Sequence, residues 1–168
     1  MRLVGLQHTD RASLNGHTEC VRILAETDKV EWNKRGERGC TALFNALNSG
    51  HSDTVEIIVQ QPNIDYNVKT VDGATPGHAA AKGGNVKYVE TLAAEEMFHS
   101  WNIPDIDGDT PIMMALKEDK INIFEVLLRC LRVDLSYRNQ EGWSLVFRAI
   151  QRNKLGEKIC KCQVEKIL

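Results

Sequence analysis

Three alternating aspartates, Asp105, Asp107 and Asp109, resemble the start of a calcium-binding loop, in which carboxylate oxygens ligate the ion. Such a loop also requires Gly at its sixth position and Glu at its twelfth. This chain has Thr110 and Leu116 at those places. We therefore interpret the segment as a tight turn and predict no calcium site there.

Two further groups could carry chemistry, a cysteine pair and a histidine. Cys160 and Cys162 are two residues apart, but a structural zinc site usually needs four well-spaced ligands. His78 could act as a base, yet catalysis would require a nucleophile and an orienting acid beside it, and the sequence offers neither. We predict no catalytic residue, no metal, no cofactor and no small-molecule substrate.

The elements that would position these residues form a tandem repeat. The phrase Gly-x-Thr/Ser recurs in steps of 34, 35 and 34 residues, and an alanine follows each glycine in the same register. The glycines are Gly39, Gly73, Gly108 and Gly142, and the alanines are Ala46, Ala80, Ala115 and Ala149. Periods of this length indicate stacked supersecondary units.

Each unit contains signals for two short helices. Thr75-Pro76 and Thr110-Pro111 are typical helix starts, because Thr caps free amides and Pro fits the first helical position. Gly50 and Gly84 suit the left-handed turn that closes a helix. Asp119 occupies the same place in the next unit, where we expect a strained or altered turn.

The segments Gly73 to Ala80 and Gly108 to Ala115 carry Thr-Pro and Ala at the offsets of the ankyrin signature, and the chain resembles ankyrin repeat proteins from about residue 12 to 160. The resemblance implies an all-α solenoid of helix-turn-helix pairs with β-hairpin tips. It implies about five repeats, the first and last degenerate, in one domain over residues 1–168. The expected repeats are 5–33, 34–67, 68–102, 103–136 and 137–168.

Within that resemblance, His78 matches the histidine that ties adjacent loops by hydrogen bonds, and we expect a structural role for it. Gly77 replaces a usual leucine, which predicts a small void or a shifted helix. The column Trp32, Tyr66 and Trp101 could stack on bases, but packing between neighbouring hairpins is the favoured interpretation. A column of asparagines is expected to cap or close the hairpin loops; its members are Asn33, Asn67 and Asn102.

Composition restricts the classes of partner and compartment. The formal net charge is −2, which gives no broad attraction to nucleic acid or to anionic membranes. No apolar run is long enough to span a membrane, and residues 1–10 are too short and polar for a secretory signal. Five cysteines, an odd number in unrelated columns, indicate reduced thiols in an intracellular protein, cytoplasmic or nuclear.

The resemblance implies a protein or peptide partner bound across the hairpin tips and the concave face. Three tip positions where solvent-exposed polar residues are expected are apolar: Val71, Ile106 and Trp143. Exposed apolar residues often mark an interaction site. Replacing Trp143 with Ala is predicted to weaken binding by about 2 kcal/mol or more, unless the ring packs on the adjacent hairpin. The predicted surface comprises Arg35, Glu37, Arg38, Lys69, Val71, Asp72, Ile106, Asp107, Asp109, Gln140 and Trp143.

We therefore predict a non-enzymatic, monomeric scaffold or adaptor module. An alternative is a targeting fragment whose catalytic domain lies outside this chain, which the degenerate first and last repeats would favour. A nucleic-acid binder is disfavoured by the charge balance and would show affinity that falls steeply with salt. A purely structural array that self-associates through an end repeat would show concentration-dependent light scattering.

Overall fold

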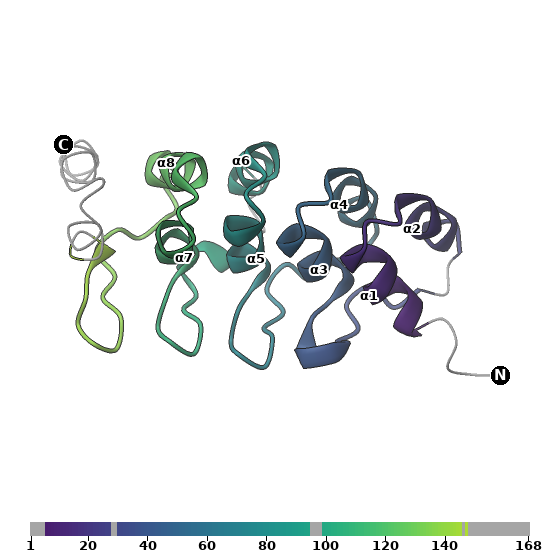
Figure 1. The fold of residues 1–168 in the computed structure, drawn as a ribbon, viewed down its shortest axis with the longest axis horizontal. Coiled ribbons are helices and arrows are strands. Elements are labelled where there is room, and N and C mark those ends of the chain that lie inside the picture. Colours follow the sequence, from purple (N-terminus) through teal and green to yellow (C-terminus); the bar gives the residue numbers. More distant parts are fainter. Residues whose placement is uncertain (1–5, 28–29, 95–98, 146, 148–168) are drawn as a thin grey trace.

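The computed structural model describes residues 6–27, 30–94, 99–145 and 147. Its helices form two rows, with α1, α3, α5 and α7 stacked in one row and α2, α4, α6 and α8 lying over them (Figure 1). Among the described residues, no helix is both long enough and apolar enough to cross a bilayer. The helices are α1 (Leu6–Leu14), α2 (Thr18–Ala25), α3 (Ala42–Asn48), α4 (Ser52–Val59), α5 (Pro76–Gly83), α6 (Val86–Ala94), α7 (Pro111–Lys117) and α8 (Ile121–Arg129).

The helix ends follow the sequence signals. Thr41 caps α3 by accepting a hydrogen bond from the Phe44 amide at 3.2 Å, and Pro76 and Pro111 open α5 and α7. Gly84 closes α5 in the left-handed conformation with φ of 77°. Asp119 takes the same conformation with φ of 58°, so the strained turn expected there is confirmed.

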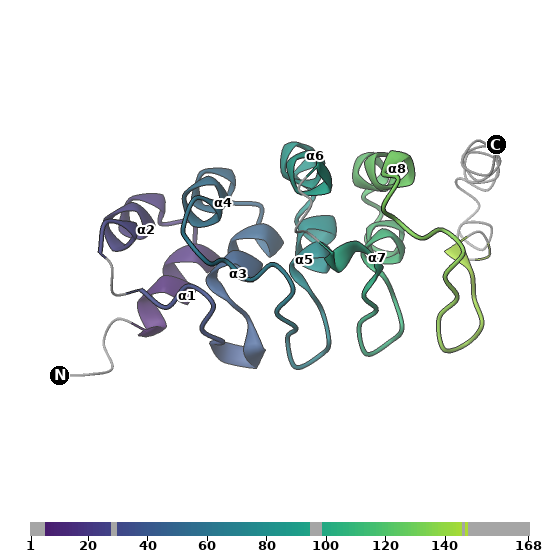
Figure 2. The same cartoon turned by 180° about the vertical axis from the view of Figure 1, so that it is seen from behind.

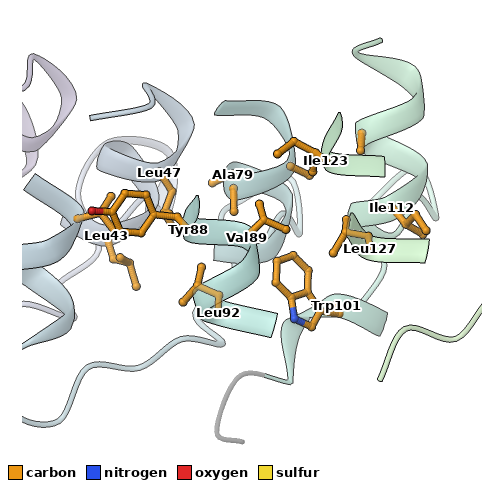
Figure 3. Packing of buried hydrophobic residues seen from close by; sticks show 14 of the residues in the cluster. Leu43, Leu47, Ala79, Tyr88, Val89, Leu92, Trp101, Ile112, Ile123 and Leu127 are labelled. Atoms are coloured by element: carbon orange, nitrogen blue, oxygen red, sulfur yellow. The ribbon is translucent and has the colours of Figure 1, made fainter. Parts of the chain in front are cut away.

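The predicted stack of helix pairs is confirmed, and it buries a continuous apolar core between successive repeats. Figure 3 shows the indole of Trp101, in the short 3-10 helix η2 (Ser100–Asn102), pointing toward Val89 of α6 and Leu127 of α8. Trp101 is 1% exposed, and Val89 and Leu127 are fully buried. Trp32 is also buried, so the expected packing is confirmed at these two positions, but Trp101 packs toward the second helices of two repeats and not between neighbouring hairpins.

The first repeat differs from the others in its core. Thr9 and Ser13 are buried in α1 at the places where α3 has Leu43 and Leu47. A hydroxyl contributes less apolar area than a leucine side chain, so this pair of helices has a weaker hydrophobic contribution. These buried hydroxyl side chains confirm the prediction that the first repeat is degenerate.

The asparagine column has a different role from the one expected. Asn33 does not close its own loop, because its side-chain amide donates to the Asn63 carbonyl at 2.6 Å and its oxygen accepts from the Asp65 amide at 2.8 Å. Asn102 makes the corresponding two bonds, at 2.6 and 2.7 Å, to the loop that follows α8. These side chains therefore tie each loop to the loop of the next repeat.

The loops that project from the first row of helices are hairpin-like turns, each closed by a backbone hydrogen bond: Gly36 to Cys40, Thr70 to Ala74, Asp105 to Asp109 and Asn139 to Trp143. An isolated antiparallel bridge also joins Arg138 and Ser144. The loop of the second repeat contains a 3-10 turn, η1 (Glu37–Gly39). The tips are too short for a longer ladder of strand hydrogen bonds, so the expected hairpins are present as tight turns without named strands.

The void expected beside Gly77 is absent. A Cβ atom added there would lie 3.0 Å from Pro111 Cγ and 3.1 Å from the Ser100 carbonyl oxygen. Ser100 of the same repeat and Pro111 of the next one therefore occupy the space that a side chain would take, and Gly77 permits this close approach.

Candidate binding surface

The tip of each of the last three repeats is closed by a side-chain acceptor. Asp105 Oδ1 accepts from the amides of Asp107 at 3.0 Å and Asp109 at 2.8 Å. Thr70 and Asn139 occupy the equivalent places and accept from their own tip amides in the same way. This role was not predicted from the sequence, although each acceptor stands three residues before the recurring glycine, which is a recognisable signal.

Backbone hydrogen bonds join neighbouring tips into a row. The Val71 amide donates to the Arg38 carbonyl at 2.9 Å, and the Ile106 amide donates to the Asp72 carbonyl at 2.9 Å. The Arg38 guanidinium also contacts the Asp72 carboxylate at 2.6 Å. Figure 2 shows these loops side by side along one edge of the molecule. The tips of the second, third and fourth repeats therefore form one surface.

Two apolar side chains are exposed on this row. Val71 is 70% exposed and Ile106 is 67% exposed, and they occupy equivalent positions on adjacent tips. Their amides are used in the bonds between tips, while their side chains remain in solvent. The expectation that both are apolar residues at a wet surface is confirmed.

An open groove of about 520 Å³ lies between this row and the first helices. Arg38, Asp72, Ile106 and Asp107, all predicted surface residues, line it. The groove itself was not predicted from the sequence, because its floor comes from three helices that only stacking brings together. The remaining lining residues are Cys40, Phe44, Asn48, Thr70, Ala74, His78, Ala79, Lys82, Asp105 and Met114.

The other predicted surface residues fall into two groups. Five are exposed on the tips outside the groove lining: Arg35, Glu37, Lys69, Val71 and Gln140. Trp143 is only half-buried, and its ring lies against Phe147 with 5.2 Å between ring centroids. The ring contact of Trp143 is therefore within its own repeat, where the sequence left open packing on the adjacent hairpin, and part of the side chain remains exposed.

Asp109 differs from the other predicted surface residues because its side chain is fully buried. Its carboxylate points inward, with Oδ2 3.5 Å from Lys117 Nζ, and its carbonyl oxygen accepts from His78. The carboxylate therefore does not face a partner, and we omit it from the proposed surface.

His78 anchors the fourth tip to the third repeat. Its Nε2 lies 2.8 Å from the Asp109 carbonyl, which can only accept, so Nε2 carries the proton. Nδ1 accepts from the Thr75 amide at 3.1 Å. Burial lowers the pKa of His78 from 6.5, so the ring is neutral at pH 7. The predicted structural role of His78 is confirmed.

Asp10 takes the place of His78 in the first repeat and lies beneath the second tip. A Cβ on Gly36 would collide with its carboxylate, which shows how closely the two pack. Desolvation by burial raises the pKa of Asp10 from 3.8 to about 6, and the positive charge of Lys34 offsets part of this.

Replacing Asp10 with Asn is expected to stabilise the protein above pH 6, by roughly 1 kcal/mol because solvent screens a half-buried group. The folded state binds the Asp10 proton more tightly than the unfolded state, so ionisation costs stability as pH rises through the window from 3.8 to about 6. Urea unfolding at several pH values should show the gain at pH 7.5 and its loss near pH 4. A constant gain at all pH values would contradict this expectation.

The free energy of unfolding of Asp10→Asn must be compared with that of the wild type at each pH. The titration of His78 changes stability with pH in the opposite direction to that of Asp10. The pKa of His78 is lowered on folding, so its contribution is complete above pH 6.5 and falls as the pH drops below that value. The difference between wild type and Asp10→Asn cancels the His78 contribution.

The part of the chain that the structure describes holds no group of three or more His, Cys, Asp or Glu side chains that could bind a metal ion. Cys160 and Cys162 lie outside the described residues, as does most of the fifth expected repeat, 137–168.

Comparison with known proteins agrees with the stacked architecture. A family model described as ankyrin repeats (3 copies) matches residues 10–70 and 65–139. These matches span four of the helix pairs described above. No curated protein matches the chain.

Proposed function

Because the chain belongs to the ankyrin repeat family, whose repeats are generally protein–protein interaction modules, we propose that it binds a protein partner across the tips and groove of repeats two to four. The partner contacts Arg35, Glu37, Arg38, Lys69, Val71, Asp72, Ile106 and Asp107. The surface extends to Gln140 and Trp143 on the fifth tip.

The observation that carries this proposal is the exposure of Val71 and Ile106 on adjacent, hydrogen-bonded tips. An apolar side chain in water gains about 25 cal/mol for each Å² that a partner covers. The rim of charged residues around the pair, including Arg38 and Asp107, resembles the polar rim of protein interfaces.

Ankyrin repeat domains are typically non-catalytic and commonly intracellular. We propose that this chain has no activity of its own and acts inside the cell as a monomeric scaffold or adaptor. The net charge of −2 supports a protein partner over nucleic acid.

Replacing both Val71 and Ile106 with Asp is expected to weaken partner binding by at least tenfold, because two apolar contacts are lost and two charges are desolvated. Proteins captured from a cell extract by the wild-type chain should be absent from the double variant. Titration of each captured protein should then give the change in Kd.

Leu131→Asp is the matched control, because Leu131 is 88% exposed but lies in the loop after α8, away from the tips. This variant also replaces an exposed apolar side chain with a carboxylate, but outside the proposed surface. It should therefore capture the same proteins as the wild-type chain. Equal loss in the control and in the double variant, or no loss in either, would remove this surface from the function.

A further inference from the structure

The surface charge changes sign along the row of tips. The second tip, residues 34–40, carries Lys34, Arg35 and Arg38 against Glu37, an excess of two positive charges. Asp10, half-buried beneath this tip, reduces the excess to one when it is ionised. This end of the groove is therefore basic.

The fourth tip forms the opposite pole. It carries Asp105, Asp107 and Asp109, and Lys117 is the cation that lies 3.5 Å from both Asp107 and Asp109. Asp105 and Asp107 lie at the surface and the Asp109 carboxylate is buried beneath them, so three carboxylates against the Lys117 ammonium leave an excess of two negative charges, of which the surface groups carry one. The third tip lies between the poles and carries no net charge, because Lys69 offsets Asp72.

The floor between the poles is hollowed at its centre by small apolar side chains, and Asn48 and Lys82 add one polar and one positively charged group to the lining. The third repeat contributes the small side chains of Ala74 and Ala79, while Phe44 of α3 and Met114 of α7 stand on either side. This shape fits a bulky apolar side chain, and the flexible thioether of Met114 can adapt to it.

The spacing of the poles sets the length of the ligand. Packed helices lie about 8–10 Å apart, so two repeat steps separate the poles by roughly 20 Å. An extended chain rises about 3.3 Å per residue and covers that distance in about six residues. The Debye length at physiological salt is about 8 Å, so each pole acts on the nearest part of the ligand.

We propose that the groove binds an extended peptide segment of a protein partner in which an acidic and a basic side chain, about six residues apart, flank a bulky apolar side chain. The acidic side chain lies over Arg35 and Arg38, and the basic one lies over Asp105 and Asp107. The apolar side chain fills the hollow over Ala74 and Ala79. This proposal rests on the protein-binding function above and specifies its ligand.

The test is a selection from a random nine-residue peptide library against the full chain. The wild-type protein should enrich peptides with one acidic end, one basic end and an apolar centre. Arg38→Glu makes both poles acidic and should enrich peptides that are basic at both ends. Asp107→Lys cancels the negative excess of the fourth tip, so the peptides that it enriches should no longer prefer a basic side chain at either end. These outcomes do not depend on the direction in which the peptide lies.

The affinity of a wild-type-selected peptide should fall about tenfold in each reversed variant, and less at high salt. Glu90→Lys, a charge reversal on the exposed face of α6, is the matched control and should select the wild-type pattern. Arg35→Glu repeats the test at the basic pole if Arg38→Glu does not fold, as judged by circular dichroism.

The results separate this proposal from the proposed function. Selected peptides of one charge sign, or with no charge order, that still lose affinity in the Val71/Ile106 double variant would overturn the proposal and leave the function standing. So would capture of a folded partner through the tips with no peptide enriched. If neither peptide nor protein is bound, both are wrong.

Discussion

Replacing Trp101 with Ala is expected to lower the free energy of unfolding by about 3–5 kcal/mol, the largest loss of stability that we predict for a single substitution in this chain. The indole is 1% exposed and points toward Val89 and Leu127, which belong to successive repeats. Its loss leaves a cavity at the interface between repeats. In a stacked array, stability is close to the sum of repeat and interface contributions, so damage to one interface lowers the whole.

Urea unfolding followed by circular dichroism would measure this loss. Trp143→Ala is the matched control, since it removes the same side chain from a half-buried position at the fifth tip and should cost clearly less. Equal losses in the two variants, or a loss below about 1 kcal/mol in Trp101→Ala, would contradict the role assigned to Trp101.

The architecture could be predicted from sequence because its signals are local. The turn after each first helix has a left-handed backbone, which glycine such as Gly84 adopts without strain and Asp119 adopts with strain. This preference does not depend on the residues that pack around the turn. The role of His78 could also be predicted, because it stands at the histidine position of the ankyrin signature, although its bond to the Asp109 carbonyl joins residues 31 positions apart. Structural features that depend on residues close together in the chain can therefore be predicted from the sequence.

The features that could not be predicted from sequence depend on contacts between repeats. Asn33 bonds to residues about 30 positions away, and Asp109 is buried because His78 and Lys117 approach it from other elements. The exposure of Val71 could be predicted from its place on a tip. The groove could not, because the positions of α3, α5 and α7 relative to the tips follow from the stacking of whole repeats.

The second large effect on stability is expected at Gly83, where α3 and α5 approach each other closely. Replacing Gly83 with Ala is expected to destabilise the protein by about 2 kcal/mol or more. A Cβ there would lie 3.0 Å from the Leu47 carbonyl carbon and closer still to its oxygen, so α3 and α5 would have to separate. Backbone cannot rotate away as a side chain can, and the collision outweighs the gain of roughly 0.5–1 kcal/mol that Ala brings to a helix.

Gly77→Ala is the matched control, because Gly77 lies in the same helix, α5, and Ala brings the same gain in helix propensity. Its added Cβ would meet Pro111 Cγ at 3.0 Å and the Ser100 oxygen at 3.1 Å, contacts that small shifts can relieve. Thermal and urea unfolding should therefore place Gly77→Ala near wild type and Gly83→Ala well below it. If both variants unfold at the wild-type midpoint, α3 and α5 do not pack as closely as Leu47 and Gly83 indicate.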